Sequence, residues 1–549
     1  MADVLDLAQH VLTNGHTIEA SAGTGKTYSV AALVTRAVAI DDDLRIDRIL
    51  ITTFARGAAA ELRDRVRRRL AETASKLEDE VVDEEDPILT SLQADPTQRS
   101  RFIRNLRRAV VNFDNATIST IHSVCSKILA LAGQASRDDS GEEVSKRIIA
   151  EVVNDRLVAG AFDDGEPLDE ARIARLVKEQ FANPLAKKWF DPNLDEAKVA
   201  RLKVIDTMID ELVAEVDRRT RQHPSYADLI RRAELALRGD EGAEVRARFA
   251  ERYTHAFVDE AQDTDALQWQ LFHHIFPKHD PLSDHKLTAV GDPKQAIYGF
   301  RGADVNAYLA ARDVDNMSTL VTNFRSDPPI IAALNALFKG RELGKEIPYI
   351  EVKSDPKKSG SKVRGINPVE AIDIKDAGNN SKAANAAVGH VVRLLENAEI
   401  LDGETWRRVQ PKDICVLTGS NSVVQTVQTL LQGYGVPAVA SGAESVFNDS
   451  TARDFRVLLE ALDRIGDSGR VRNLATTSFF GYGLGDPRLL PDAAVHGDGE
   501  TDIILHIQAK LVGWRQALTR HGVAALAAEV TSDISVMSIF VSAFIGRLV

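Results

Sequence analysis

The chain has 549 residues, enough for roughly three or four domains, and its 44% hydrophobic and 27% charged residues are ordinary for a globular protein. The net charge of −13 argues against a protein that coats nucleic acid through its overall charge, although it is compatible with a local basic channel. Two cysteines, Cys125 and Cys415, are far apart and lack metal-ligand spacing, which argues against a disulfide framework and predicts a reducing, cytoplasmic location.

Neither end of the chain has the pattern of an export signal or a membrane span. We expect no signal segment at the N-terminus, because no basic region precedes an apolar one there. The run 534–549 is apolar but is interrupted by Ser535, Ser538, Ser542 and Arg547. It is too short to cross a bilayer, so we expect a core helix there and no membrane partner.

The segment 17–27 combines an apolar lead-in, a glycine-bearing loop and a Lys-Thr pair that opens a predicted helix. Gly23 and Gly25 permit a tight turn in which successive N–H groups converge on a triphosphate. Lys26 would reach the β- and γ-phosphates, and Thr27 would bind Mg²⁺ beside the positive end of the helix dipole. The alternative is a glycine-rich turn before an ordinary helix, since alanine stands at the first glycine of the pattern G-x-x-x-x-G-K-[ST]. The residues predicted to hold ATP are Ala20, Ser21, Ala22, Gly23, Thr24, Gly25, Lys26 and Thr27.

A strand predicted at 48–54 precedes a helix that would bury Leu62, Val66 and Leu70. Five arginines surround this helix, so we expect most of them to be solvated, and phosphate contact is the less favoured interpretation. They are Arg63, Arg65, Arg67, Arg68 and Arg69. An acidic and loose stretch is expected at 78–86, and a helical insertion at about 135–225.

Two adjacent acids, Asp259 and Glu260, end the apolar run that begins at residue 256. Such a run predicts a buried parallel strand with the acids at its carboxyl end. Asp259 would hold the Mg²⁺ that Thr27 also binds, and Glu260 would polarise an attacking water. An Asp-Glu pair alone is usually a solvated strand end, but after a phosphate loop it predicts ATP hydrolysis.

Strand and helix patterns alternate through the second half of the chain as well. Strands are predicted at 287–290, 369–374, 414–417 and 437–440, helices near 382–396 and 421–432, and a surface loop at 353–366. No internal sequence repeat is evident. The predicted fold class is α/β, with two similar halves that both have the pattern of a doubly wound parallel sheet.

Eight short motifs in this order resemble those of UvrD-type superfamily 1 DNA helicases, and most closely those of the RecB type, a subunit of the RecBCD helicase–nuclease. They are ASAGTGKT at 20–27, TTFARGAAAELRDRV at 52–66, TIHSVC at 120–125, FVDEAQD at 257–263, VGDPKQAIYGFRGAD at 290–304, LVTNFRS at 320–326, PKDICVL at 411–417 and ESVFNDSTARDF at 444–455. The resemblance covers some 450 residues.

The resemblance implies a P-loop NTPase with two RecA-like motor domains, each interrupted by a helical insertion, and ATP between them. The expected parts are motor domain 1A at 1–130 and 225–315, insertion 1B at 131–224, motor domain 2A at 316–465 and the start of insertion 2B at 466–549. It further implies ATP-driven 3′-to-5′ movement on single-stranded DNA in double-strand-break repair and recombination, and RecC- and RecD-like partner subunits.

The resemblance also assigns roles around ATP. Gln295 would sense the γ-phosphate and couple it to the DNA site, where the alternative is a polar turn residue. Arg325, placed by the resemblance on the second motor domain, would reach the γ-phosphate as an arginine finger. Phe324 would stack on adenine, or else belong to the core.

Aromatic side chains beside positive charge form the predicted DNA side. Tyr298, Phe300 and Arg301 share one loop, and a flat ring gives any base a stacking surface. Phe54 is a further stacking candidate, with a core position as the equal alternative. The remaining candidates, Thr120 and His122, would contact phosphates, although a lone histidine is usually structural.

Some features of the family are missing from this sequence. No adenine-reading glutamine stands at the expected spacing before the phosphate loop, where Gln9 is poorly placed. The later motifs H-x-x-K-G-L-E and V-A-x-T-R-A do not occur, so the sequence is expected to be the N-terminal half of a longer protein, with a second motor domain that is incomplete. The predicted function is an ATP-dependent DNA helicase or translocase polypeptide that does not unwind duplex DNA by itself. The alternatives are an ATP- and DNA-binding subunit completed by another chain, and a gene fragment.

Overall fold

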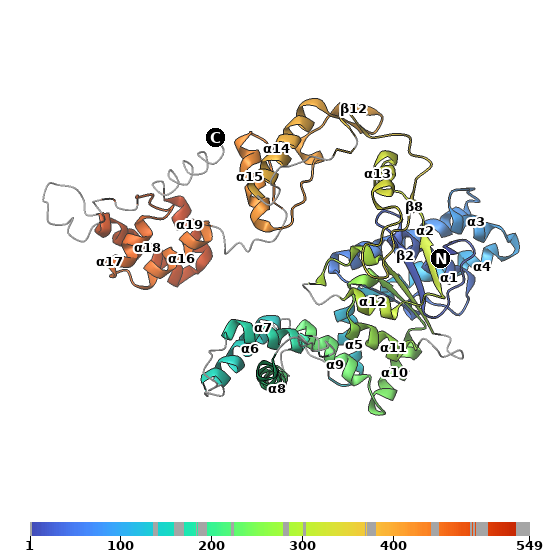
Figure 1. Cartoon of the computed structure of the whole chain (residues 1–549), viewed down its shortest axis with the longest axis horizontal. Coiled ribbons are helices and arrows are strands. Elements are labelled where there is room, and N and C mark those ends of the chain that lie inside the picture. The colour runs from blue at the N-terminus through green and yellow to red at the C-terminus, as the bar shows by residue number, and fades with distance from the viewer. Residues whose placement is uncertain are drawn as a thin grey trace. The chain divides into compact units, whose positions relative to one another are not determined.

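Figure 1 shows the computed structural model of the chain. By its internal contacts the chain divides into two units. Unit 1 comprises Met1–Ala371 and Ala398–Arg407, and unit 2 comprises Ile372–Asn397 and Arg408–Val549. The residues that the structure describes are 3–134, 141–158, 169–182, 184, 195–220, 224–277, 285–299, 304–367, 369–370, 380–440, 450–483, 486, 489 and 503–533.

Seven strands of unit 1 form one sheet in the order β1-β7-β2-β6-β5-β3-β4, and all neighbours in it are parallel. The strands are β1 (Asp3–Val4), β2 (His16–Ala20), β3 (Ile49–Thr53), β4 (Thr117–Thr120), β5 (His255–Asp259), β6 (Lys286–Gly291) and β7 (Met317–Leu320). The strands predicted at 48–54, in the apolar run that begins at residue 256 and at 287–290 are confirmed as β3, β5 and β6. The division of the chain into five parts stays a prediction. β7, which lies in the part predicted as motor domain 2A, pairs in this sheet with β2, which lies in the part predicted as motor domain 1A.

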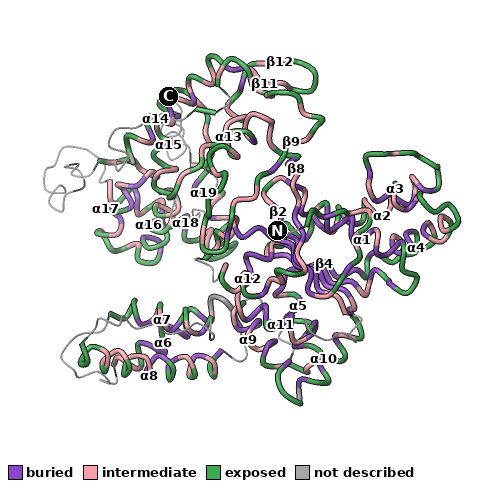
Figure 2. Tube along the Cα trace, turned by 45° about the vertical axis from the view of Figure 1, so that its right-hand side comes forward, coloured by how far each residue is buried: buried purple, intermediate pink, exposed green. Residues whose placement is uncertain are grey.

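The central strands are buried on both faces, as their nearly continuous apolar sequences predict. Successive residues still point to opposite faces: Ile49 and Ile51 of β3 belong to one core, and Leu50 belongs to the other. In Figure 2 the buried residues gather on the strands and on the helices beside them. The sheet is therefore the rigid support for whatever lies at its strand ends.

One core lies between the sheet and the helices α1 (Lys26–Ile40), α2 (Arg56–Glu78), α3 (Pro87–Gln93) and α4 (Arg99–Val111). The predicted burial of Leu62, Val66 and Leu70 on α2 is confirmed. Of the surrounding arginines, those at 65, 67 and 68 are exposed. The acidic stretch 78–86 is less loose than predicted, because buried Asp86 pairs with Arg69 and accepts hydrogen bonds from two backbone N–H groups of α3.

The other core contains residues of β3, β5 and β6 and of helices that flank the sheet. These helices are α5 (Ile121–Leu131), α9 (Tyr226–Ala236), α10 (Glu241–Arg252), α11 (Ala266–Ile275) and α12 (Val305–Ala311). A smaller core joins α6 (Gly141–Val158), α7 (Glu170–Ala182) and α8 (Glu196–Arg219) through side chains such as Val153, Val177 and Val216. The helical character predicted for 135–225 is thus confirmed over the described residues.

The rest of unit 1 contains short strands and one further helix. They are β8 (Thr322–Asn323), α13 (Pro328–Phe338), β9 (Lys353–Ser354), β10 (Val363–Arg364), β11 (Glu399–Asp402) and β12 (Thr405–Arg408), whose last residue belongs to unit 2. β8 pairs with β9, and β10, β11 and β12 form a three-stranded sheet. The segment 353–366, predicted as a surface loop, therefore contains two short strands.

Unit 2 has two helical cores among its described residues. One holds α14 (Asn380–Asn397) and α15 (Asn421–Gly433), which confirms two predicted helices. The other holds α16 (Ser450–Asp463), α17 (Ser468–Ala475), α18 (Ile503–His521) and α19 (Val523–Ser532). No described helix of either unit is long and apolar enough to cross a membrane.

The strands predicted at 414–417 and 437–440 do not form. Ile414 and Val416 pack against the core of α14 and α15, whereas Leu417 is 90% exposed, so the alternation of a strand is present. In the described part of unit 2, however, no neighbouring strand hydrogen-bonds to either segment, and a strand needs such a neighbour. The strand predicted at 369–374 and the helix predicted at 534–549 lie mostly or wholly outside the described residues.

Candidate nucleotide site and nucleic-acid edge

The predicted site residues follow the carboxyl ends of adjacent strands, because those ends meet at one edge of a parallel sheet. In the sheet order β7-β2-β6-β5-β3-β4, the residues that follow these strands are Arg325, the phosphate loop, Gln295, Glu260, Phe54 and His122. This edge therefore runs from the residues predicted for ATP to those predicted for DNA.

The phosphate loop connects β2 to α1 and has the backbone that a phosphate cradle requires. Gly23 and Gly25 have φ of 79° and 93°, a left-handed conformation that favours glycine. The Thr24 hydroxyl donates a hydrogen bond to the Ser21 carbonyl at 2.7 Å, which tightens the turn. Lys26 begins α1, so the helix directs its N-terminal N–H groups at this turn.

Lys26 and Glu260 form an ion pair inside the site. The ammonium group donates to the Glu260 carboxylate at 2.8 Å, and Lys26 is only 9% exposed. Gln262 also donates to this carboxylate, at 2.9 Å. Glu260 has a left-handed backbone, with φ of 51°, which is uncommon for a residue with a side chain and is typical of functional sites.

Buried carboxyl groups surround this pair. Burial and the neighbouring Glu260 raise the pKa of Asp259 to about 6, and the same two causes raise the pKa of Asp263 to about 6. The Asp263 Oδ1 atom is buried without a hydrogen-bond partner among the described residues. Among the described residues, no three His, Cys, Asp or Glu side chains are placed to hold a metal ion by themselves. Mg²⁺ would stabilise the charged form of Asp259, and it would take its further ligands from the Thr27 hydroxyl in the first turn of α1 and from the phosphates of ATP.

Gln262 links the acid pair to the loop after β6, and its sequence position did not reveal this role. Its side-chain oxygen accepts from the Asp292 N–H at 2.9 Å while its amide group holds Glu260. A Cβ atom at Gly291 would lie 2.8 Å from that oxygen, so a side chain there would force the Gln262 amide to shift. Gln295 donates to the Asp292 carboxylate at 2.7 Å, which connects the predicted phosphate sensor to the same network.

Arg325 lies in the segment that packs directly against the phosphate loop. The Phe324 N–H donates to the Gly23 carbonyl at 2.8 Å, and a Cβ atom at Gly23 would lie 2.7 Å from the Arg325 Cβ. The Phe324 side chain is 56% exposed, so it is not a core residue. Asn323, which the sequence did not single out, is buried between the two segments.

Two aromatic residues from separate motifs meet on the side of the edge that is predicted to bind DNA. The rings of Phe54 and Tyr298 stack with centroids 5.6 Å apart and planes inclined by 19°. Both side chains are half-buried, which leaves part of this aromatic pair accessible. Phe300 and Arg301, the other candidates in the loop after β6, lie outside the described residues.

The motif after β4 places His122 beside another aromatic ring. Its imidazole meets the ring of Tyr226 edge to face, with centroids 4.9 Å apart. Burial, and next the charge of Arg56, lower the pKa of His122, so the imidazole is neutral at pH 7. Thr120 is buried, and its hydroxyl lies 3.2 Å from that of Ser123. Contact of Thr120 or His122 with phosphates stays a prediction.

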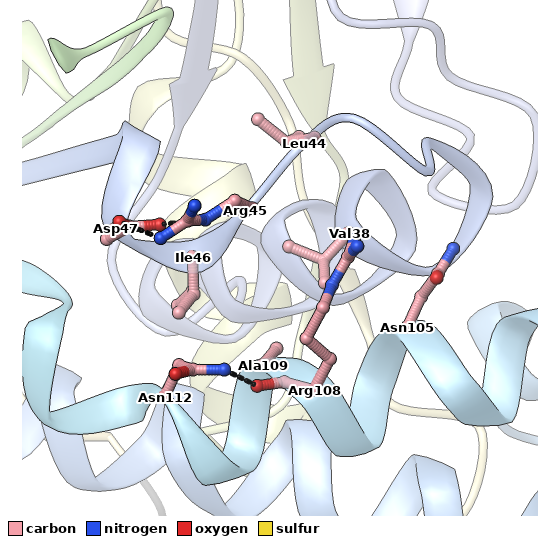
Figure 3. Close-up of a pocket in the computed structure, with 9 residues that line it drawn as sticks. All are labelled: Val38, Leu44, Arg45, Ile46, Asp47, Asn105, Arg108, Ala109 and Asn112. Carbon is pink, nitrogen blue, oxygen red and sulfur yellow. Dashed lines mark hydrogen bonds and ion pairs between the residues drawn. The ribbon is translucent and has the colours of Figure 1, made fainter.

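A pocket away from this edge is too small for a nucleotide. It lies beside the end of α1 and the middle of α4, and Figure 3 shows the side chains that line it, among them Val38, Asn105 and Arg108. Its volume is about 10 Å³, the space of about one water molecule.

A P-loop between β2 and α1, with an acid pair at the end of a nearby parallel strand, is the arrangement typical of the P-loop NTPase class. The family model described as the UvrD/REP helicase N-terminal domain matches residues 4–314, and the chain belongs to this family. Its relatives include the RecBCD enzyme subunit RecB of Mycolicibacterium smegmatis, 33% identical over 93% of this chain and 46% of the relative. The RecBCD enzyme subunit RecB of Escherichia coli is 25% identical over 95% of the chain and 55% of the relative. The chain thus spans about half the length of these relatives.

Proposed function

We propose that this polypeptide hydrolyses Mg-ATP and uses the energy to move 3′ to 5′ along single-stranded DNA as a helicase or translocase. The observation that carries the proposal is the order of side chains along one sheet edge, from the phosphate loop through Glu260 and Gln295 to the stacked rings of Phe54 and Tyr298. Membership of a helicase family supports the reaction. The direction is what the resemblance of the sequence motifs to those of UvrD-type helicases implies.

The ion pair of Lys26 and Glu260 suggests how the site is activated. The phosphates of ATP would compete for the Lys26 ammonium, because they carry more negative charge than one carboxylate. Glu260, still held by Gln262, would then be able to accept a proton from the attacking water. Mg²⁺, when bound by Asp259 and Thr27, supplies positive charge that neutralises the phosphates.

The network beyond Glu260 supports a coupling between hydrolysis and DNA. Gln262 connects Glu260 to Asp292, and Asp292 accepts from Gln295. Tyr298 follows in the same loop and stacks on Phe54. A change in how Gln295 contacts the γ-phosphate would therefore shift a residue that presents a stacking surface to the bases.

The resemblance to RecB subunits also supports a biological setting. We propose that the chain acts on DNA ends in double-strand-break repair and recombination, in the cytoplasm, with RecC- and RecD-like partner subunits. The second candidate function is an ATP- and DNA-binding subunit without unwinding activity of its own, and the experiment below separates the two.

The test of the proposed function is phosphate release by the purified chain with and without oligo-dT. The parent should release phosphate faster when DNA is present, and Glu260→Gln should abolish turnover. Phe54→Ala should weaken the DNA response by about 1–3 kcal/mol, the value of one base–aromatic stack, which is a shift of about 5- to 150-fold in the half-stimulating DNA concentration. Phe338→Ala is the matched control, since Phe338 packs on Tyr349 with centroids 5.5 Å apart but does not follow a strand of the large sheet.

Duplexes with a 3′ or a 5′ single-stranded tail complete this test. Strand displacement from the 3′-tailed duplex, without displacement from the 5′-tailed duplex, supports a 3′-to-5′ motor. DNA-stimulated hydrolysis without displacement supports a translocase that does not unwind duplex DNA by itself, as the sequence predicts. Binding of ATP and DNA without DNA-stimulated hydrolysis favours the binding subunit. A parent chain that releases no phosphate under any condition would contradict the proposed reaction.

A further inference from the structure

One buried amide, the side chain of Asn323, joins the phosphate loop to the segment that carries Arg325. Its Nδ2 donates to the Ala22 carbonyl at 2.8 Å. Its Oδ1 accepts from the backbone N–H groups of Arg325 and Ser326, both at 2.9 Å. Asn323 is 5% exposed, so these three bonds form away from bulk water, where an unpaired amide would be costly.

These bonds set the orientation of the phosphate loop itself. A peptide unit is planar, so a fixed carbonyl also fixes the N–H group on the opposite side of the same plane. Asn323 fixes the Ala22 carbonyl in this way, and the Phe324 N–H fixes the Gly23 carbonyl at 2.8 Å. Two successive peptide planes of the cradle are therefore held by residues that lie some 300 positions later in the chain.

The segment that holds the cradle is itself held from its other side. The Asp355 N–H donates to the Asn323 carbonyl at 3.1 Å, beside the pairing of β8 with β9. Lys358 donates to the Arg325 carbonyl at 2.8 Å. The backbone of Arg325 is thus fixed on both sides, while its side chain is exposed.

We propose that Asn323 is a positioning residue that sets the phosphate loop and Arg325 in one arrangement, so that nucleotide affinity and the place of the arginine depend on the same amide. The inference rests on the proposed function, because it concerns the same ATP site. The two polar atoms of the Asn323 side chain have different roles, which a substitution can separate. The Nδ2 donor acts on the cradle, and the Oδ1 acceptor acts on the backbone of Arg325.

Asn323→Asp separates these two ends. A carboxylate keeps the acceptor for the N–H groups of Arg325 and Ser326 but turns an acceptor towards the Ala22 carbonyl, which repels it. The affinity for Mg-ADP, measured by titration with a fluorescent ADP analogue, should fall about tenfold or more. ADP has no γ-phosphate, so Arg325→Ala should change this affinity less than about twofold. The rate of ATP hydrolysis by Asn323→Asp at saturating ATP should stay within about threefold of the parent rate. The substitution is thus expected to lower nucleotide affinity and to leave turnover nearly unchanged.

Asn335 provides a matched control. Its Nδ2 donates to the Val352 carbonyl at 2.8 Å, and its Oδ1 accepts from the Tyr349 hydroxyl at 2.9 Å, so the chemistry is the same in another part of unit 1. Asn335→Asp should leave Mg-ADP affinity unchanged. If Asn323→Asp does not fold, Asn323→Ala is titrated with Mg-ADP in its place. Alanine lacks both the donor and the acceptor, so both nucleotide affinity and turnover should be reduced.

The possible outcomes separate this inference from the proposed function. A parent that binds Mg-ADP and an Asn323→Asp variant that binds it equally well would overturn the inference alone. Equal losses of affinity in Asn323→Asp and Asn335→Asp would overturn it as well, since they would indicate general destabilisation. A parent without any affinity for Mg-ADP would overturn the proposed function and the inference together.

Discussion

Gly23 and Gly133 have nearly the same left-handed backbone but very different surroundings. Their φ angles are 79° and 73°. A Cβ atom at Gly23 would lie 2.7 Å from the Arg325 Cβ, whereas a Cβ atom at Gly133 would meet nothing within 4 Å. A side chain would therefore strain the backbone at both positions. Only at Gly23 would it also collide with Arg325.

We expect Gly133→Ala to lower the free energy of unfolding by about 1–2 kcal/mol, the cost of a left-handed residue with a side chain. Gly23→Ala should cost more, because Arg325 or the phosphate loop must also move. It should weaken Mg-ADP binding at least about tenfold, while Gly133→Ala should not. Urea unfolding and ADP titration of both variants provide the measurement, and equal ADP affinity of the two would contradict the contact.

The raised pKa of Asp259 predicts how Mg²⁺ binding depends on pH. Burial and Glu260 raise this pKa to about 6, and the carboxyl group must lose its proton to bind the cation. The increase in melting temperature on adding Mg²⁺ should therefore be large at pH 7.5 and should disappear as the pH falls through about 6. Asp259→Asn should show little increase at either pH. A response of the parent that is as large at pH 5 as at pH 7.5 would contradict this account.

Without metal, the contribution of Asp259 to the free energy of unfolding should depend on pH in the opposite direction to Mg²⁺ binding. The folded-state pKa of Asp259 is about 6, above the ordinary value of 3.8, so the folded state binds the proton more tightly than the unfolded state. This group therefore contributes stability that is fully present below about pH 4 and is lost as the pH rises through about 6.

Single residues of the site differ in how far the sequence could predict them. Lys26, Asp259 and Glu260 stand in short motifs whose spacing indicates their chemistry. Asn323 acts on a carbonyl 301 positions earlier in the chain, and the oxygen of Gln262 acts on an N–H group 30 positions later. Those partners follow from the order of the strands, which no local pattern contains.

At the scale of elements, the sequence predicts where several strands of the large sheet lie in the chain, but it does not predict which strands pair with each other. β3, β5 and β6 have short, β-branched or apolar runs that are typical of a buried strand. That β7 lies beside β2 depends on the topology of the whole sheet. The segment 414–417 shows the converse case, since its alternation is present but no partner strand pairs with it in the described residues.

A buried ion pair links Glu19, in the strand before the phosphate loop, to Arg312, the residue that follows α12. Arg312 contacts Glu19 at 3.0 Å, both side chains are at most 9% exposed, and the Tyr308 hydroxyl donates to the same carboxylate at 3.3 Å. Breaking a buried pair leaves an uncompensated charge, so Arg312→Met should cost about 3–5 kcal/mol of unfolding free energy.

The double variant Glu19→Gln, Arg312→Met should recover much of that loss, because the buried charge is then gone. Urea unfolding followed by tryptophan fluorescence measures both. Arg248→Met is the control, since Arg248 and Glu244 form an exposed pair worth about 0–1 kcal/mol. A cost for Arg312→Met as small as that of the control would show that the pair does not stabilise the sheet.

At the scale of the whole molecule, charge and DNA binding are compatible. The net charge is −13, and several arginines around α2 and α4 are paired with acids, as in the contacts of Arg65 with Glu61 and Arg99 with Glu80. General attraction to the DNA backbone is therefore weak. We propose that the sheet edge binds bases through aromatic stacking instead. The residues predicted to do so follow β3 and β6, and β6 also precedes Gln295 of the nucleotide site.

The most direct test of the whole account is whether Lys26 binds a nucleotide. Calorimetric titration with magnesium and a non-hydrolysable ATP analogue should show one site in the parent chain. Affinity should fall at least about tenfold in Lys26→Ala, because the buried ammonium is the cation at the phosphates. Glu260→Gln should bind at least as tightly as the parent, since it removes the carboxylate that competes for Lys26. Equal affinity of the parent and Lys26→Ala would contradict the nucleotide site on which the proposed function depends.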